Sequence, residues 1–326
     1  MRFALRRLGF FAVTLWACLT LNFIIPRAMP GNPLLVMMAK YHGHLNAKAL
    51  QAIEVAFGIQ THTSLIVQYF EYLGNTFTGN WGMSLLQTEP VSTVIRGALP
   101  WTLGLIGVTT ILAFVLGTLI GIVGAWRRGG WLDSVLPPVF VIFTSIPFFW
   151  IGMLLIMFVG KFIPTYPTSG AYSYGAAPSL SWSFIVDVLQ HALLPAIAIL
   201  ITSIGGWILT MRNTMVTVLA EDYVRMARAK GLPGWRIMFD YAARNAMLPN
   251  LSGFAMSLGF ILSGAVVVEY LFSYQGVGNY LIAAADSEDY ALMQALFLLI
   301  TVAVLVAILL ADIVTALLDP RTRTGG

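Results

Sequence analysis

Charged residues are scarce in this sequence. Asp, Glu, Lys and Arg make up 10% of its 326 residues, whereas about a quarter is usual in soluble domains. Hydrophobic residues make up 58%, and the mean hydropathy is +0.82. This composition excludes a soluble globular protein. It predicts an all-α protein that crosses a membrane several times.

Cysteine and the short catalytic motifs are also scarce or missing. Cys18 is the only cysteine, so the chain forms no internal disulfide framework and no cysteine-based zinc site. The sequence has no G-x-x-x-x-G-K-[ST] nucleotide-binding loop, no G-x-S-x-G and no H-E-x-x-H, which disfavours an ATPase or an intramembrane hydrolase. His42 and His44 form a His-x-His pair, but without a clear further ligand such loop histidines are typical of polar surface. We predict no catalytic residue and no metal site.

Six apolar segments are long enough to span a bilayer, for which a helix needs about 20 residues. Their limits are 8–28, 100–126, 134–160, 188–211, 249–272 and 291–317. Arg2, Arg6 and Arg7 before the first segment resemble the start of a signal peptide. The apolar run is longer than a typical signal core and no small-x-small site follows it, so we expect an uncleaved first helix.

The basic residues predict the orientation, because cytoplasmic loops of membrane proteins carry the excess of Lys and Arg. With the N-terminus inside, thirteen of the eighteen basic residues lie inside and five outside. Both termini are then cytoplasmic. Residues 31–99 form a large extracytoplasmic insertion, in which 46–57 and 63–73 are expected to be short helices on the outer face. Residues 161–187 form a second outer loop.

The most charged run, EDYVRMARAKGLPG (residues 221–234), lies in the cytoplasmic loop 212–248. Residues 217–230 are predicted to be helical, with acids early and bases late, the order that a helix dipole favours. Gly231 is a natural helix end and Pro233 prevents continuation. A second helix is expected from Gly234 to about Met247, ending before Pro249.

Two interpretations of this loop remain open. It is either a solvated connector that carries positive-inside charge, or a rigid element that docks on another protein. Small residues such as Ala227 and Ala229 let a partner's backbone approach closely, and charges at the rim set the register. The alternation of small and charged residues favours docking.

The charged loop resembles that of a known family. DYVRMARAKGL followed by ARNAMLPN is similar to the cytoplasmic EAA loop of ABC-importer permeases of the oligopeptide, dipeptide and nickel branch. Further matches follow in the same order along nearly the whole chain: MPGNP (29–33), GNWGMS (79–84), PVSTVIRGALPWTLGL (90–105), SIPFFWIG (145–152), VVVEYLFSYQGVGNYL (266–281) and DY (289–290). The chain departs from the family at Tyr241-Ala242-Ala243, usually His-Ala-Leu, at Gln275-Gly276, often Pro-Gly, and at Arg225, an acid in other branches.

The resemblance implies a type I ABC importer permease fold with six transmembrane helices in one domain. Such a permease binds no cofactor itself, and ATP and Mg lie in two partner ATPase subunits. The other implied partners are a second permease and an extracytoplasmic substrate-binding protein, and no nucleic acid is involved. The implied location is the cytoplasmic membrane of a bacterium or archaeon. The expected ATPase-coupling residues are Glu221, Asp222, Tyr223, Arg225, Ala227, Arg228, Ala229, Lys230 and Gly231.

Gate or pathway candidates lie near the last outer loop. They are Glu269, Tyr270, Phe272, Gly276 and Gly278. An acid inside a membrane segment is a functional candidate because its ionised form is costly there. For Glu269 we favour gating or structural hydrogen bonding over substrate contact. For Asp312 we favour a structural role.

The glycines in the apolar segments allow close helix packing, which serves either ordinary packing or rocking between states. Peptides are the expected substrate, and oligosaccharides or nickel are the alternatives within the same importer class. A stand-alone secondary transporter would predict an inverted repeat and charges inside several helices. The sequence has only two marginal acids in its apolar segments and no evident repeat.

Overall fold

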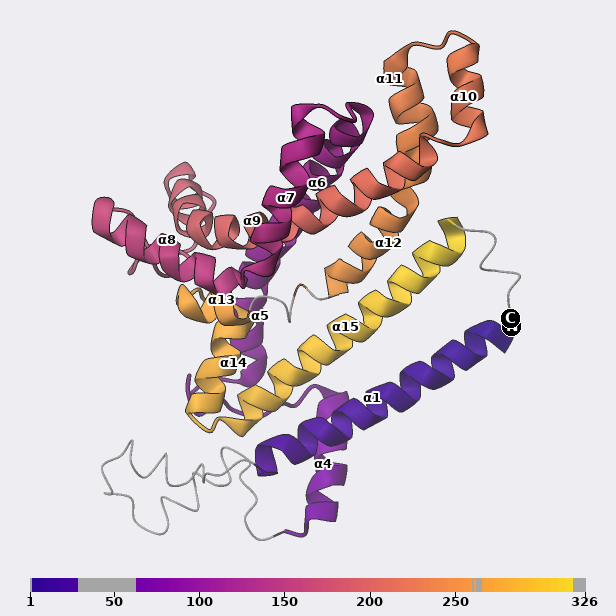
Figure 1. Cartoon of the computed structure of the whole chain (residues 1–326). Coiled ribbons are helices and arrows are strands. Elements are labelled where there is room, and N and C mark those ends of the chain that lie inside the picture. Colours follow the sequence, from indigo (N-terminus) through magenta and orange to yellow (C-terminus); the bar gives the residue numbers. More distant parts are fainter. Residues whose placement is uncertain (1, 29–62, 260, 262–265, 319–326) are drawn as a thin grey trace. The chain divides into compact units, whose positions relative to one another are not determined.

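The computed structural model describes residues 2–28, 63–259, 261 and 266–318, and the regular elements in these ranges are helices (Figure 1). The chain divides into two compact units. Unit 1 consists of Met1–Thr102, Leu262–Tyr270 and Gln275–Val306, and unit 2 of Leu103–Ile261, Leu271–Tyr274 and Ala307–Gly326. The prediction of an all-α membrane protein is confirmed.

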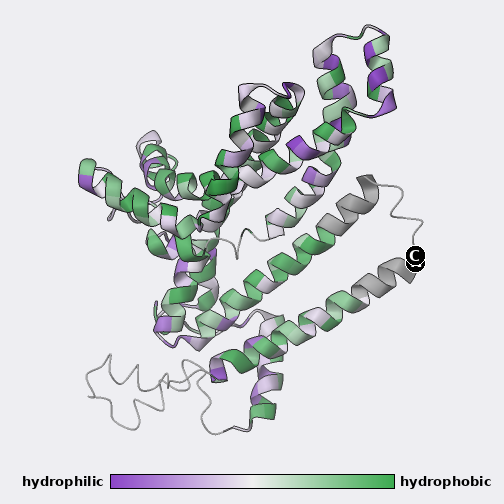
Figure 2. Cartoon of the chain, in the orientation of Figure 1, coloured by the Kyte–Doolittle hydropathy of each residue, from purple (hydrophilic) through white to green (hydrophobic). Residues whose placement is uncertain are grey.

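Four helices in the described ranges are long and apolar enough to cross a membrane. They are Gly9–Ala28, Val91–Trp126, Trp182–Val218 and Tyr290–Leu310. Figure 2 shows hydrophobic residues along these helices. The apolar segment 134–160 is not one straight helix: α7 (Trp131–Ser145) and α8 (Phe148–Phe162) meet at 90°, and they count as a fifth span if the pair is one broken span. Pro147 explains the break, because Ile146 before it adopts an extended backbone (φ −89°, ψ 126°).

The segment 249–272 is described only in part. Its beginning lies in α12 (Arg244–Gly259) and its end in α13 (Val266–Leu271). Residues 260 and 262–265 between them lie outside the described residues, as do the predicted helix 46–57, the MPGNP motif and the loop histidines at 42, 44 and 62. The side chain of Asp312 is likewise outside the described part of α15.

Unit 1 is built around a core shared by three helices. Its elements are α1 (Arg2–Ala28), α4 (Leu65–Thr78), α5 (Val91–Thr102), α13, α14 (Val277–Asp286) and the first part of α15 (Tyr290–Leu318). Val94 of α5, Leu281 of α14 and Leu296 of α15 are buried together. Asn22 joins α1 to this unit, since its Nδ2 donates to the backbone oxygen of Gln294 at 2.8 Å. The predicted helix 63–73 is present as α4, shifted toward its C-terminal end.

Unit 2 contains α6 (Val108–Trp126), α7, α8, α9 (Trp182–Val218), α10 (Asp222–Ala229), α11 (Gly234–Arg236) and α12. Two π-helical segments, Leu103–Gly107 (η1) and Ile237–Ala243 (η2), precede α6 and α12. The second apolar segment is helical from Val91, well before the predicted start at Pro100, and it turns π-helical just after this proline. A proline removes one backbone donor, and π-helical turns, although rare, occur mostly as single turns inside α-helices.

Close packing of α6 on α9 depends on two glycines. A Cβ atom at Gly117 would lie 2.6 Å from the Cβ of Trp207, and one at Gly121 would lie 2.7 Å from the backbone oxygen of Ile208. Gly124 differs, because nothing lies within 4 Å of the position that its Cβ would take. Gly117 and Gly121 are therefore needed for the close packing of α6 on α9, whereas Gly124 is not.

Replacing Gly121 with alanine is expected to destabilise the protein by about 1–3 kcal/mol, because overpacking against backbone cannot be relieved by a rotamer change. Gly124→Ala is the matched control one turn away on the same helix, where a Cβ meets no neighbour, and we expect stability to rise by up to about 1 kcal/mol because alanine has the higher helix propensity. Thermal unfolding of both variants in the same detergent measures the difference. Equal melting temperatures for the two variants would refute the packing role of Gly121.

Candidate coupling site and neighbouring buried carboxylates

The charged loop begins with a sharp turn between α9 and α10. The prediction of one helix over 217–230 is wrong at its start: α9 ends at Val218 and α10 begins at Asp222. Glu221 has an extended backbone (φ −69°, ψ 149°), and its backbone oxygen accepts the N–H groups of Val224 and Arg225. Glu221 is thus the N-cap of α10, and Asp222 stands in its first turn, where an acid favours the helix dipole.

Gly231 ends α10, as predicted. Its φ of +71° is a left-handed conformation that glycine adopts without strain. The N–H of Gly231 donates to the oxygen of Arg228 at 2.9 Å, and the N–H of Leu232 donates to the oxygen of Ala227 at 3.4 Å. This pair of bonds is the Schellman motif, which satisfies carbonyl groups that a helix end leaves unpaired.

The chain then returns as one continuous helical rod. Pro233 precedes α11, which passes directly into η2 and α12. The prediction that this helix ends before Pro249 is wrong, because α12 contains Pro249 and continues to Gly259. Tertiary contacts override the local effect of the proline: Asn250 beside it is 1% exposed, and its Nδ2 donates to Thr118 Oγ1 of α6 at 3.1 Å.

One face of α10 is closed by the loop itself. Val224 and Ala227 are buried and pack with Ile237, Trp126 and Leu232. Tyr223 accepts a hydrogen bond at its hydroxyl from Nδ2 of Asn245 at 3.1 Å, and the Arg228 guanidinium carbon lies 5.8 Å from the centre of the Trp126 ring. These contacts hold α10 as a rigid part of unit 2.

The opposite face of α10 is open. Asp222, Arg225, Met226 and Ala229 are exposed, and their spacing of three, four and seven residues places them along one side of the helix. Met226 is 58% exposed. The exposed ion pair between Asp222 and Arg225, at 3.5 Å, adds little stability of its own. The face is therefore apolar at its centre with charges around it.

The predicted coupling residues divide between these two faces. Ala227 belongs to the closed face, whereas Tyr223 is hydrogen-bonded to the following helix and still 39% exposed. Glu221, Asp222, Arg225, Arg228, Ala229, Lys230 and Gly231 are exposed. The sequence reasoning missed Met226 and the 60% exposed Trp235. The spacing of Met226 from Asp222 and Ala229 is the signal that could have identified it.

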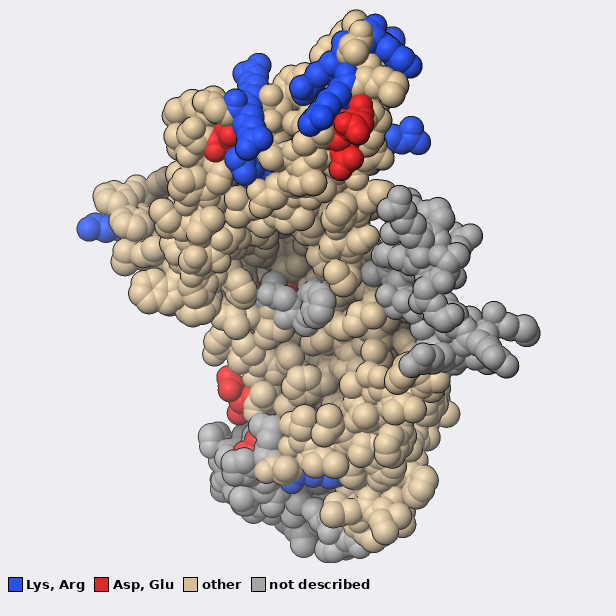
Figure 3. Space-filling model, turned by 45° about the vertical axis from the view of Figure 1, so that its right-hand side comes forward, with Lys and Arg blue, Asp and Glu red and all other residues tan. Residues whose placement is uncertain are grey.

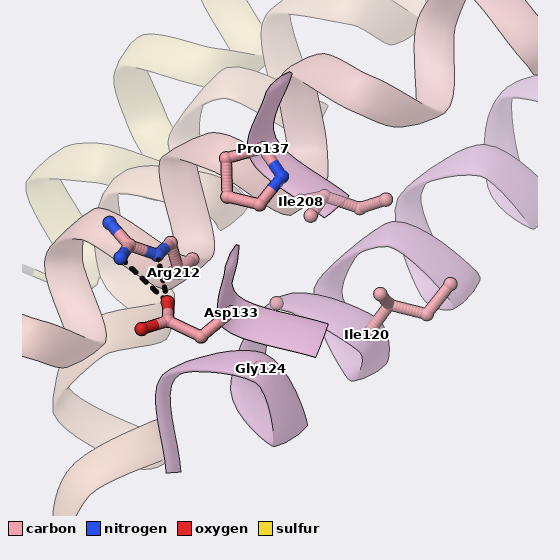
Figure 4. A pocket seen from close by; sticks show the side chains of 7 residues that line it. Ile120, Gly124, Asp133, Pro137, Ile208 and Arg212 are labelled. Atoms are coloured by element: carbon pink, nitrogen blue, oxygen red, sulfur yellow. Dashed lines mark hydrogen bonds and ion pairs between the residues drawn. The ribbon is translucent and has the colours of Figure 1, made fainter. Parts of the chain in front are cut away.

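Basic residues gather at this end of unit 2. Figure 3 shows Lys and Arg over the α10–α11 loop and over the turn that follows α6. Below this end, Arg212 of α9 points at Asp133 of α7 (Figure 4), with its Nε and Nη2 at 2.8 and 2.6 Å from Asp133 Oδ1. The second carboxylate oxygen accepts the N–H of Gly129 at 2.9 Å. Asp133 therefore fastens the turn after α6 to the helix that carries the loop.

Glu269 lies at a different place, in unit 1. It is 1% exposed, and its Oε2 accepts the N–H of Gly278 at 2.7 Å. The Asn279 N–H and the Thr102 hydroxyl also interact with this carboxyl group, and Thr102 Oγ1 accepts the N–H of Val277 at 2.8 Å. The first N–H groups of α14, which have no partner within the helix, are thus bound by Glu269 and Thr102.

Of the gate candidates, the two glycines are brought together with Glu269 within unit 1. Gly276 and Gly278 lie against Glu269, and a Cβ atom at either glycine would collide with its surroundings, at Gly276 with the Glu269 carboxyl group itself. Tyr270 is exposed. Phe272 belongs to unit 2, where its ring lies close to Gly152 and its backbone oxygen accepts the N–H of Gly170. His191, which opens the fourth segment, bonds through Nδ1 to the backbone oxygen of Asp187.

A second buried acid connects two of the sequence motifs. Asp289 is fully buried, and its Oδ2 accepts hydrogen bonds from Ser84 Oγ at 2.6 Å and from the N–H of Leu86 at 3.0 Å. Its Oδ1 accepts the N–H of Leu292 in the first turn of α15. The GNWGMS and DY motifs, far apart in the sequence, therefore meet around one carboxylate.

Comparison with known proteins defines the class. Residues 117–324 match the family described as "Binding-protein-dependent transport system inner membrane component". The chain belongs to this family, so it is a multi-pass inner-membrane permease subunit of an ABC importer and not an enzyme. Membership implies an ATPase and a substrate-binding protein as partners, and it disfavours a stand-alone secondary transporter.

Individual relatives match over nearly their whole length. The di/tripeptide transport system permease protein DppB of Pseudomonas aeruginosa is 34% identical, over 98% of both chains. The oligopeptide transport system permease protein AppB of Bacillus subtilis is 34% identical over 92% of both. The dipeptide transport system permease protein DppB of Lactococcus lactis is 32% identical over 99% of both.

Proposed function

We propose that this chain forms part of the translocation pathway of an importer for peptides. The relatives quoted above are named for di-, tri- and oligopeptide transport, and they match from end to end. The same importer class with oligosaccharides or nickel as cargo has no comparable support. We further propose six transmembrane helices with both termini in the cytoplasm, on the strength of the thirteen-to-five distribution of basic residues.

Within this transporter, α10 is the helix that contacts the ATPase and transmits the movement of the ATPase to the permease. The observation that carries this assignment is the one-sided burial of α10: its inner face packs on Ile237 and Trp126, while its outer face presents Met226 at 58% exposure. A helix that is packed on the rest of unit 2 on one side and exposed on the other can be displaced by a partner and move together with unit 2 as a rigid body. A merely solvated connector would not need the closed inner face.

ATP and Mg are proposed to bind in two partner ATPase subunits, since the chain has no nucleotide-binding loop of its own. A second, similar permease completes the pathway. Closure of the ATPases on ATP would draw the two α10 helices together and turn the pathway outward, and hydrolysis would reverse this. ATP binding then biases an equilibrium between two rigid arrangements.

Reconstitution tests this function. The chain, a second permease, the ATPase subunits and the binding protein are placed in liposomes, and uptake of labelled dipeptides, tripeptides and longer peptides is followed with and without ATP. We expect uptake only with ATP and the binding protein present. Uptake that proceeds without any ATPase subunit would overturn the proposal. ATP-dependent uptake of an oligosaccharide or nickel in place of peptides would overturn the choice of cargo alone.

A further inference from the structure

Helix α4 of unit 1 exposes a purely apolar stripe. Ile66, Phe70 and Phe77 are 72%, 66% and 73% exposed. Their spacing of four and seven residues puts them on one face. A neighbouring face carries exposed polar residues, Glu71, Asn75 and Thr78. The exposed surface of α4 is therefore amphipathic, with one apolar face and one polar face.

The remaining face of α4 is bonded to α1. The Tyr69 hydroxyl lies 2.8 Å from Thr20 Oγ1, and the Tyr72 hydroxyl accepts a hydrogen bond from Nδ2 of Asn22 at 3.0 Å. Arg27 Nε donates to Gln68 Oε1 at 3.1 Å. The α1 residues in these bonds lie in the C-terminal half of the candidate span Gly9–Ala28. At 1.5 Å per residue, the bonds hold α4 against the last ~12 Å of this span, up to the level where the hydrocarbon of the membrane ends.

The residues at this junction are of the types found at a membrane surface. The Arg27 guanidinium lies 3.8 Å from the centre of the Phe23 ring, which in turn meets the Tyr69 ring edge-on at 5.2 Å. Tyrosines gather at the boundary between lipid and water, and arginines extend their charged ends toward water there. On α1, Leu21 and Ile24 remain exposed beside the bonds to α4. The apolar stripe of α4 therefore continues the apolar, exposed surface of a membrane span.

We propose that α4 is an interfacial helix, with Ile66, Phe70 and Phe77 inserted among the lipids at the end of α1. Such helices lie in the plane of the membrane surface, with their apolar face about 5–10 Å deep in the boundary between headgroups and acyl chains. Lipid fits the stripe better than a protein partner does, because the three side chains of the stripe are all apolar and α1 beside it, a candidate membrane span, also exposes apolar residues, Leu21 and Ile24. With the orientation proposed above this is the outer leaflet. The inference does not depend on which solute is transported.

Spin labelling tests the inference on the whole transporter in lipid nanodiscs. Cys18→Ser removes the only cysteine, and Phe70→Cys or Asn75→Cys then carries the nitroxide on the apolar or the polar face. We expect label collisions with molecular oxygen to exceed those with a water-soluble nickel chelate at position 70, and the ratio to reverse at position 75. Ile66→Cys and Glu71→Cys form a second matched pair.

Two outcomes would overturn the inference. Frequent collisions with the nickel chelate at position 70 would mean that the stripe faces water. Few collisions with either reagent would mean that protein covers it, whether the binding protein or another part of this chain. Because the four positions are exposed, their labelled variants are expected to fold, and peptide uptake by each preparation verifies this independently.

Discussion

A transporter with Met226→Asp is expected to lose its ATPase subunits on purification and nearly all of its ATP-driven uptake. Met226 is the apolar centre of the open face of α10, between Asp222 and Ala229. A charge placed in the desolvated centre of an interface commonly costs about 2 kcal/mol, or roughly thirty-fold in affinity. The loop itself should stay folded, because its own packing depends on Val224 and Ala227 on the other face.

Two variants serve as controls for this prediction. Met226→Leu keeps an apolar side chain of similar volume, and we expect normal uptake. Lys161→Ala removes an exposed charge near the end of α8 in the same unit and should leave the ATPase bound. The amount of ATPase that co-purifies with each variant, together with uptake in liposomes, measures the effect. A Met226→Asp variant that keeps both would show that the partner contacts a different face of the loop.

How far the sequence predicts this site depends on how local each signal is. Gly231 could be identified as a helix end because the Schellman motif needs only the residues from 227 to 232. The turn at 219–221 was missed, because nothing in that stretch breaks a helix by itself. It forms because Val224 and Ala227 must reach Ile237 and Trp126, which lie on other helices.

The prolines also show that local sequence rules are not sufficient, because some end a helix and others lie inside one. Ile146-Pro147 does end a helix, in agreement with the local rule, and it breaks an apolar segment that hydropathy alone makes continuous. Pro195 and Pro249 do not end a helix, since they lie inside α9 and α12. In a packed bundle, contacts such as that of Asn250 with Thr118 decide whether a helix continues past a proline. Sequence patterns therefore predict the class and the loop better than the limits of the helices.

Structural hydrogen bonding was among the roles expected for Glu269, but its partners could not be predicted from the sequence for a similar reason. Its partners, Thr102 and Gly278, lie on two other elements of unit 1. Apolar periodicity cannot indicate that a carboxylate from one helix caps the start of another. The nearby glycines could be chosen as candidates from the resemblance, but their reason is steric: they leave room for the carboxyl group.

Glu269→Ala is expected to destabilise the protein severely. It leaves the N–H groups of Gly278 and Asn279 without their acceptor in a buried site. Each buried donor that loses its partner costs about 1–3 kcal/mol, so the two together cost roughly 2–6 kcal/mol, a large part of the 5–15 kcal/mol that typically keeps a domain folded. The prediction is a large drop in melting temperature in detergent and a low yield of folded protein.

Comparison of three variants separates the structural role of Glu269 from a role in the transport pathway. Glu269→Gln keeps one oxygen that can accept a hydrogen bond, so it should recover much of the stability that alanine loses. Glu89→Ala removes an exposed acid from the same unit and should change neither stability nor uptake. If Glu269 caps α14, then uptake will fall in proportion to the loss of folded protein across the series. A Glu269→Ala protein that melts normally but carries no peptide would contradict the capping role, and would assign the carboxyl group to the pathway.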